Sequence, residues 1–118
     1  MNDQKTTQAE KVLHLTVDTF DQALTDAGDK PVLVDFFATW CGPCQMAAPV
    51  IDKLGQDYDG KAVIAKVDVD DNGDLASRYG VRSIPTVVLI HNGEVVDKQV
   101  GFNGEAGYVS MLKKVLGD

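Results

Sequence analysis

The stretch Trp40-Cys41-Gly42-Pro43-Cys44 contains the only tryptophan and the only two cysteines of the chain. An apolar run typical of a buried strand precedes it, and a pattern typical of a helix follows it. A cysteine at such a junction lies near unpaired backbone N–H groups and the positive end of the helix dipole, which stabilise its thiolate. Two thiols separated by two residues beside a βαβ pattern therefore indicate a redox-active pair.

The composition is that of a single globular domain. With 118 residues, the chain is long enough to bury a substantial core. Hydrophobic residues make up 44% and charged residues 25%, which is an ordinary balance. Two cysteines are too few for a disulfide scaffold. The net charge of -7 argues against a nucleic-acid partner, because the phosphates would be repelled.

The ends of the chain contain no targeting or membrane-spanning pattern. Residues 1–10 are polar and are expected to form a flexible tail, followed by one domain over residues 11–118. No apolar run has the length of a signal peptide or a membrane span. The protein is therefore expected to be cytoplasmic, with no membrane partner.

Alternating strand and helix patterns predict an α/β fold. Strands are expected over residues 12–15, 32–38, 61–69, 86–90 and 95–100. Helices are expected from an N-cap at Asp18 to Gly28, over residues 41–58, from an N-cap at Asp70 or Asp71 to Gly80, and along the apolar stripe from Tyr108 to Leu116. Asn92-Gly93 predicts a hairpin, so the last two strands should be antiparallel. Apolar residues at helical spacing after the cysteines, Met46 among them, are expected to face the core.

Asp35 interrupts the apolar run 32–38, whose apolar residues at both parities predict a strand covered on both faces. An unpaired carboxylate in such a place is costly. Asp35 either makes structural hydrogen bonds only, or has a pKa raised by desolvation so that it exchanges protons near neutral pH. Its position six residues before Cys41 favours the second interpretation. Lys66 is either a solvent-facing residue or a partner of this acid, and the sequence leaves both open.

A metal site is not expected. Zinc would need ligands in addition to the two thiols, and His14 and His91 are badly placed to supply them. The sequence therefore predicts no bound metal.

Four segments together resemble the thioredoxin family, in the family's order: Val34-Asp35-Phe36, Trp40-Cys41-Gly42-Pro43-Cys44, Ile84-Pro85-Thr86 and Asn92-Gly93-Glu94. The resemblance extends from about Lys11 to the C-terminus. It implies the thioredoxin fold, with a mixed five-stranded central sheet flanked by four helices.

The resemblance also implies roles for individual residues. Cys41 would be the exposed nucleophile and Cys44 the buried resolving thiol. Asp35 would be the buried proton acceptor for Cys44, tuned by Lys66 nearby. Pro85 would follow a cis peptide bond and pack against the two cysteines.

A shallow docking surface for substrates is implied as well. Its expected members are Trp40, Gly42, Pro43, Ile84, Pro85, Thr86, Gly93 and Gly101, with the Ile84 backbone facing an extended substrate segment. Two positions depart from the commonest bacterial pattern: Phe37 replaces a frequent tryptophan, and Gln45 stands where a lysine often follows the second cysteine. Both could alter the choice of partner.

The implied activity is the reduction of disulfides in cytoplasmic proteins, by a monomer with no bound cofactor. Electrons would come from NADPH through a flavin-containing thioredoxin reductase. Gly42-Pro43 places no imidazole between the thiols to favour the reduced thiolate, which favours a reductant over an oxidant or isomerase. A non-catalytic binding module that uses the same surface is the main alternative.

Overall fold

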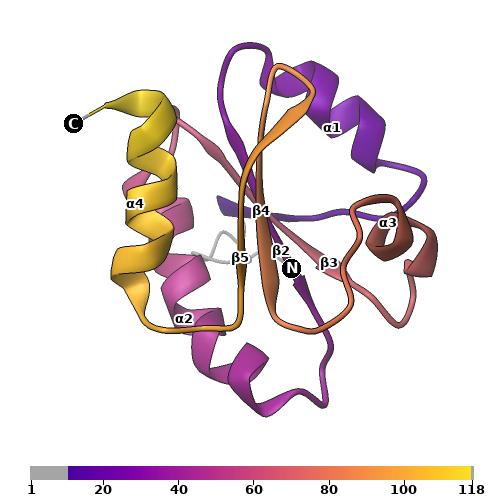
Figure 1. Cartoon of the computed structure of the whole chain (residues 1–118). Helices are drawn as coiled ribbons and strands as arrows, with labels where there is room; N and C mark the ends of the chain where they lie inside the picture. Colours follow the sequence, from indigo (N-terminus) through magenta and orange to yellow (C-terminus); the bar gives the residue numbers. More distant parts are fainter. Residues whose placement is uncertain (1–10, 118) are drawn as a thin grey trace, which may run out of the picture.

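The computed structural model describes residues 11–117, which form a five-stranded sheet with four helices (Figure 1). The predicted tail, residues 1–10, lies outside the described residues. The elements in chain order are β1 (Val12–His14), α1 (Phe20–Ala27), β2 (Val32–Phe37), α2 (Gly42–Asp57), β3 (Val63–Asp68), α3 (Gly73–Arg78), β4 (Thr86–His91), β5 (Glu94–Val100) and α4 (Glu105–Leu116). The prediction of a mixed five-stranded sheet with four helices is confirmed.

The strand order in the sheet is β1-β3-β2-β4-β5. β3 runs parallel to β1 and β2, whereas β4 runs antiparallel to β2 and β5. The turn between β4 and β5 places Asn92 at φ 53° and Gly93 at φ 82°. Asparagine and glycine tolerate this left-handed backbone better than other residues, so the predicted hairpin forms as expected.

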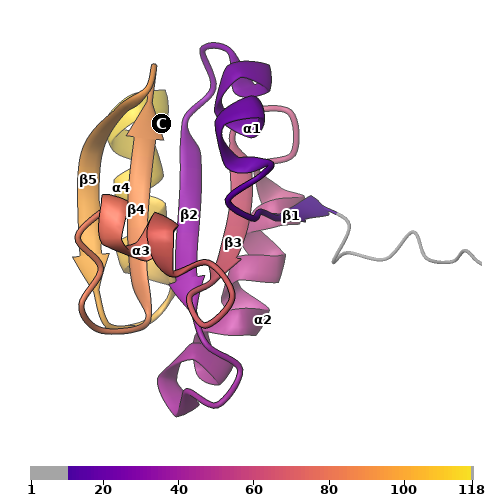
Figure 2. The same ribbon diagram turned by 90° about the vertical axis from the view of Figure 1, so that its right-hand side faces the viewer.

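Helices cover both faces of the sheet (Figures 1 and 2). Leu33 of β2 and Val87 of β4 pack in one cluster with residues of α2 and α4. Val34 and Val88, their neighbours along the strands, pack in a second cluster with Phe20 of α1 and Leu75 of α3. The period-2 alternation therefore divides two apolar strands between two cores, which explains their continuous apolar runs.

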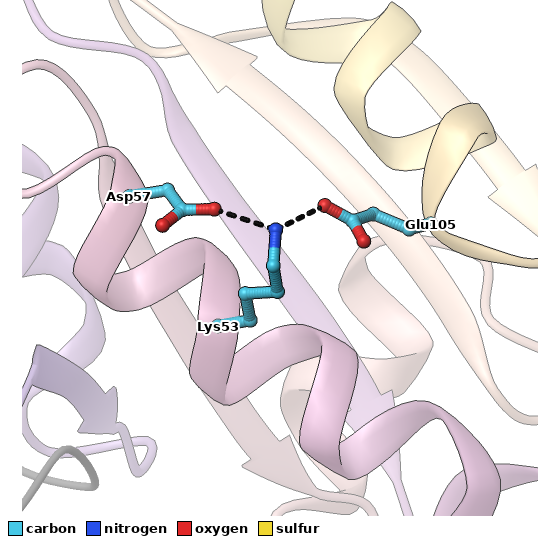
Figure 3. A network of polar contacts seen from close by, with 3 residues as sticks. All are labelled: Lys53, Asp57 and Glu105. Atoms are coloured by element: carbon cyan, nitrogen blue, oxygen red, sulfur yellow. Dashed lines mark hydrogen bonds and ion pairs between the residues drawn. The ribbon is translucent and has the colours of Figure 1, made fainter.

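A charged link joins α2 and α4 at the surface of the first core (Figure 3). The Lys53 ammonium donates to Asp57 at 2.9 Å and to Glu105 at 2.8 Å. These two hydrogen bonds raise the pKa of Lys53. Because all three side chains are solvent-exposed, the link contributes little to stability.

Two predicted helix caps are wrong. α1 begins after Thr19 rather than Asp18, because the Thr19 hydroxyl accepts a hydrogen bond from the Thr16 N–H at 2.9 Å and closes a turn there. α3 begins after Asn72 rather than Asp70 or Asp71. The Asn72 side chain donates to the Asp68 carbonyl and accepts from the Val17 N–H, so it holds two segments together.

The predicted core face of α2 is also wrong at one end. Ile51 and Leu54 are fully buried, but Met46 is 68% exposed. The buried stripe of α2 includes Cys44, Ala47, Ile51 and Leu54, and Met46 lies off this stripe, so its side chain faces solvent. At the far end of the chain, Leu116 of α4 is likewise exposed while Tyr108 and Leu112 are buried.

Among residues 11–117, no helix combines the length and the apolar character that crossing a bilayer requires.

Candidate active site

Cys41 and Cys44 are joined by a disulfide bond at the start of α2, with their Cα atoms 5.2 Å apart. Cys41 is the N-cap residue of the helix, and its sulfur accepts a hydrogen bond from the Cys44 N–H at 3.2 Å. Pro43 lies in the first turn, where an N–H would have no helical partner. The N–H donor and the helix dipole both favour negative charge on the Cys41 sulfur, as a nucleophilic thiolate requires.

The two cysteines are buried to nearly the same degree. Cys41 is 5% exposed and Cys44 is 3% exposed, so the prediction of an exposed Cys41 is wrong for this disulfide form. The reason is packing, since both cysteines form a small cluster with Ala38 and are flanked by Phe37, Val69 and Ile84. The exposed surface around them belongs to other residues, namely Trp40, Gly42, Pro43 and Met46.

The segment Ile84-Pro85-Thr86 lies against the disulfide. The Ile84–Pro85 peptide bond is cis, and the Ile84 carbonyl oxygen lies 3.7 Å from the Cys41 sulfur. Two bonds hold this segment in place. The Thr86 hydroxyl donates to the Ser83 carbonyl at 2.7 Å, and the Gly101 N–H donates to the Pro85 carbonyl at 2.8 Å. The fold thus brings Gly101 to the site from the end of β5.

Gly93 is not part of this site, contrary to the sequence-based expectation. β4 begins next to Pro85 and runs to His91, so the turn that contains Gly93 lies at the opposite end of the strand. Figure 1 shows this turn and the start of α2 at opposite ends of the sheet. Gly93 serves the hairpin rather than the surface around the cysteines.

Hydrogen bonds orient two side chains next to the cysteines. The Trp40 indole N–H donates to the Asp70 carboxylate at 2.8 Å, although Trp40 is 69% exposed. The Gln45 side-chain amide donates to the Thr39 carbonyl at 2.9 Å. Sequence reasoning treated Asp70 as a helix cap and missed this role. No local signal could have found it, because the two residues are thirty positions apart.

Asp35 is completely buried on β2, the strand that leads to the cysteines. Neither carboxyl oxygen has a hydrogen-bond partner among the described residues. Burial raises the pKa of Asp35 from 3.8 to about 6, and the nearby Lys66 charge partly opposes this effect. A carboxyl group with this pKa exchanges its proton close to neutral pH.

The sequence left open whether Lys66 faces solvent or is a partner of Asp35, and each interpretation holds in part. Lys66 is half-buried on β3, and its Cα is the register partner of Asp35. Its ammonium lies 4.4 Å from the ring centroid of Phe37 instead of forming an ion pair with the acid. Lys66 therefore acts on Asp35 through its electrostatic field, while a cation–π contact holds its charged end.

No group of three metal-ligating side chains occurs within residues 11–117. His14 is exposed on β1, and His91 contacts the Asp29 carbonyl at 2.9 Å. Neither histidine belongs to the cluster around the cysteines.

Comparison with known proteins places this geometry in a family. The family model described as Thioredoxin matches residues 11–114. A thioredoxin of Chlorobaculum thiosulfatiphilum is 53% identical over 93 residues, which cover 79% of this chain and 85% of the relative. A thioredoxin of Staphylococcus epidermidis is 49% identical over 105 residues, covering 89% and 98% respectively. Thioredoxin 1 of Nostoc sp. is 52% identical over 87 residues, covering 74% and 80%.

The family match spans the cysteine pair, the buried acid and the cis-proline segment alike. This chain belongs to the thioredoxin family.

Proposed function

We propose that this thiol–disulfide oxidoreductase works in the cytoplasm as a general reductant of protein disulfides, with Cys41 as nucleophile and Cys44 as resolving thiol. The observation that carries the proposal is the position of the Cys41 sulfur. It accepts the Cys44 N–H at the N-terminus of α2 and faces the Ile84 carbonyl before a cis-proline. Family membership supports the disulfide-reductase activity.

In the first step, the Cys41 thiolate attacks one sulfur of a substrate disulfide. A mixed disulfide forms between Cys41 and the substrate, and the second substrate sulfur leaves as a thiolate. The N–H donor from Cys44 and the helix dipole keep Cys41 ionised, which sets the concentration of the attacking species.

In the second step, the Cys44 thiol loses its proton to Asp35 and attacks the Cys41 sulfur. The Cys41–Cys44 disulfide forms, and the substrate leaves as a dithiol after it gains two electrons and two protons. Asp35 suits this task because its pKa of about 6 lets it accept a proton at neutral pH and release it to solvent afterwards. Lys66 tunes that pKa downward.

A docking surface surrounds the sulfurs. Gly42 and Pro43 are exposed, and the indole of Trp40 is fixed by Asp70. The Ile84 backbone, held by the hydrogen bond between Gly101 and Pro85, provides an edge for an extended substrate segment. Trp40, Gly42, Pro43 and Ile84 carry no charge, so this surface suits many unfolded or flexible partners and only transient complexes.

The disulfide form must be reduced again for turnover. We assign this step to a flavin-containing thioredoxin reductase that draws electrons from NADPH, with no cofactor resident in the chain. Gly42-Pro43 carries no imidazole or other cation between the thiols, which supports a reducing rather than an oxidising couple.

The test is reduction of a disulfide-linked protein such as insulin, with NADPH and thioredoxin reductase as the electron source. Wild-type protein should accelerate the reduction, and Cys41→Ser should abolish the acceleration. His14→Ser, an exposed substitution on β1, is the matched control and should retain full activity. Full activity in a Cys41→Ser, Cys44→Ser variant would instead identify a binding module.

A further inference from the structure

Three buried side-chain atoms within residues 11–117 lack any hydrogen-bond partner: both carboxyl oxygens of Asp35 and the hydroxyl of Tyr108. Asp35 and Tyr108 are each 0% exposed. Buried polar groups are nearly always hydrogen-bonded, so each exception requires an explanation. The two residues offer complementary groups, because a phenol donates one hydrogen bond and an ionised carboxylate only accepts.

The fold places both residues on the same side of the sheet. Leu33, two positions before Asp35 on β2, belongs to the core between the sheet and α4. Val87, the register partner of Asp35 on β4, belongs to the same core. Side chains at alternate positions and in paired positions share a face, so the carboxyl of Asp35 points into this core. Tyr108 of α4 packs in it together with Leu33 and Val87.

The protonation states fit such a pairing. Burial raises the pKa of Tyr108 to about 12, and the nearby Asp35 carboxylate contributes in the same direction. The phenol therefore keeps its proton throughout the pH range in which Asp35 titrates, and remains available as a donor. An unpaired carboxylate in the same core would be far more costly than one that accepts this bond.

We propose that Tyr108 is a positioning residue for Asp35: its hydroxyl donates to the ionised carboxyl across one buried water and stabilises the charged form of the proton acceptor. The role of Asp35 as proton acceptor rests on the proposed function. The pairing of Asp35 with Tyr108 is independent of that function.

The other groups that face Asp35 are few. Lys66 of β3 contributes positive charge, and the inward-facing residues of β4 on this side, Val87 and Leu89, are apolar. The cysteines at the start of α2 do not titrate while they form a disulfide. In the disulfide form, Lys66 is the charged side chain among the described residues that acts on the pKa of Asp35, in addition to burial.

The first test uses the unmodified disulfide form of the full chain, with tyrosine labelled by ¹³C at Cζ and followed by NMR from pH 4 to pH 9. The Tyr108 resonance should shift with the midpoint of Asp35, near pH 6. Tyr79 is the internal control, since it packs on the opposite face of the sheet. The shift should vanish in Asp35→Asn. A Tyr108 chemical shift that does not change around the Asp35 midpoint would refute the pairing, whatever Asp35 does in the reaction.

The second test compares Tyr108→Phe with Tyr79→Phe, which removes a hydroxyl from the other core. Loss of a hydrogen bond to a charged group should raise the Asp35 midpoint in Tyr108→Phe by about one pH unit. Resolution of the mixed disulfide should then slow about fivefold at pH 6 and little at pH 8, because fewer acceptors are ionised at the lower pH. Tyr79→Phe should change neither the Asp35 midpoint nor the rate at which the mixed disulfide is resolved. An unchanged or lowered midpoint in Tyr108→Phe refutes the proposal, whereas a raised midpoint without a kinetic effect would refute only the role of Asp35 in the reaction.

Discussion

Asp35 and Lys66 occupy paired positions on neighbouring parallel strands, yet the ammonium of Lys66 lies over the Phe37 ring and the carboxyl of Asp35 has no protein hydrogen-bond partner among the described residues. A direct ion pair would hold the pKa of Asp35 low and remove it from proton transfer at neutral pH. The observed separation leaves the desolvation effect dominant. The carboxyl is therefore an acid that titrates in the range where thiol exchange takes place.

Asp35→Asn should increase the stability of the protein at pH 8 while it slows disulfide reduction. The Asp35 carboxyl has a pKa of about 6 in the folded state and 3.8 in the unfolded state. Its ionisation therefore costs more free energy in the folded protein, which destabilises the folded state. This destabilisation grows as the pH rises from 3.8 to about 6 and then stays constant, at about 3 kcal/mol. Urea unfolding should thus show a larger stabilisation by Asp35→Asn at pH 8 than at pH 5. Equal stabilisation at both pH values would contradict the raised pKa.

Lys66→Met should raise the pKa of Asp35 further, because the Lys66 charge lowers it in the native protein. We expect the pH midpoint of mixed-disulfide resolution to move upward by less than about one pH unit, since a half-buried charge is partly screened. Lys61→Met, which removes an exposed lysine just before β3, is the matched control and should leave the midpoint in place. The idea fails if both variants behave alike.

Cys44→Ser should accumulate a covalent complex with protein substrates, because the mixed disulfide on Cys41 then lacks its resolving thiol. Cys41→Ser should accumulate none. Non-reducing electrophoresis after mixing with a disulfide-linked substrate distinguishes the two. Trapping by Cys41→Ser in place of Cys44→Ser would reverse the assigned roles.

Gly101→Ala should destabilise the protein by about 1 kcal/mol, because an L side chain is strained at a positive φ. Gly101 has φ 84°, and its N–H holds the Pro85 carbonyl next to the cysteines. Activity should fall as well, because relief of the strain at residue 101 would shift the N–H that holds the Pro85 carbonyl. Gly73→Ala at the start of α3 is the control, because its backbone is ordinary and a Cβ there would meet no atom within 4 Å. Thermal unfolding that is equal in the two variants would argue against a strained Gly101.

The framework of this fold could be predicted because its signals are local. Apolar runs define the strands, and the Asn92-Gly93 turn sets the antiparallel pairing of the last two. The cysteine pair is recognisable from its spacing at a strand-to-helix junction. Burial of Asp35 also follows from a local pattern, since it interrupts a strand that is apolar at both parities.

The errors and omissions arise where contacts between distant segments decide the outcome. Asn72 is the residue before α3, and its side chain accepts from the distant Val17 N–H instead of capping the helix, which no local cap rule includes. Gly93 was assigned to the site although its strand runs away from the cysteines. Tyr108 looks like an ordinary member of an apolar helical stripe. Only the packing of α4 over β2 and β4 brings its hydroxyl into the core that contains Asp35.

The equilibrium potential of the Cys41–Cys44 couple against glutathione at neutral pH tests the central claim most directly, with Trp40 fluorescence as the reporter. A cytoplasmic reductant should have a potential near about −270 mV, the value typical of thioredoxins. A potential near about −180 mV, as in protein disulfide isomerase, would contradict the account and assign the protein to disulfide formation instead.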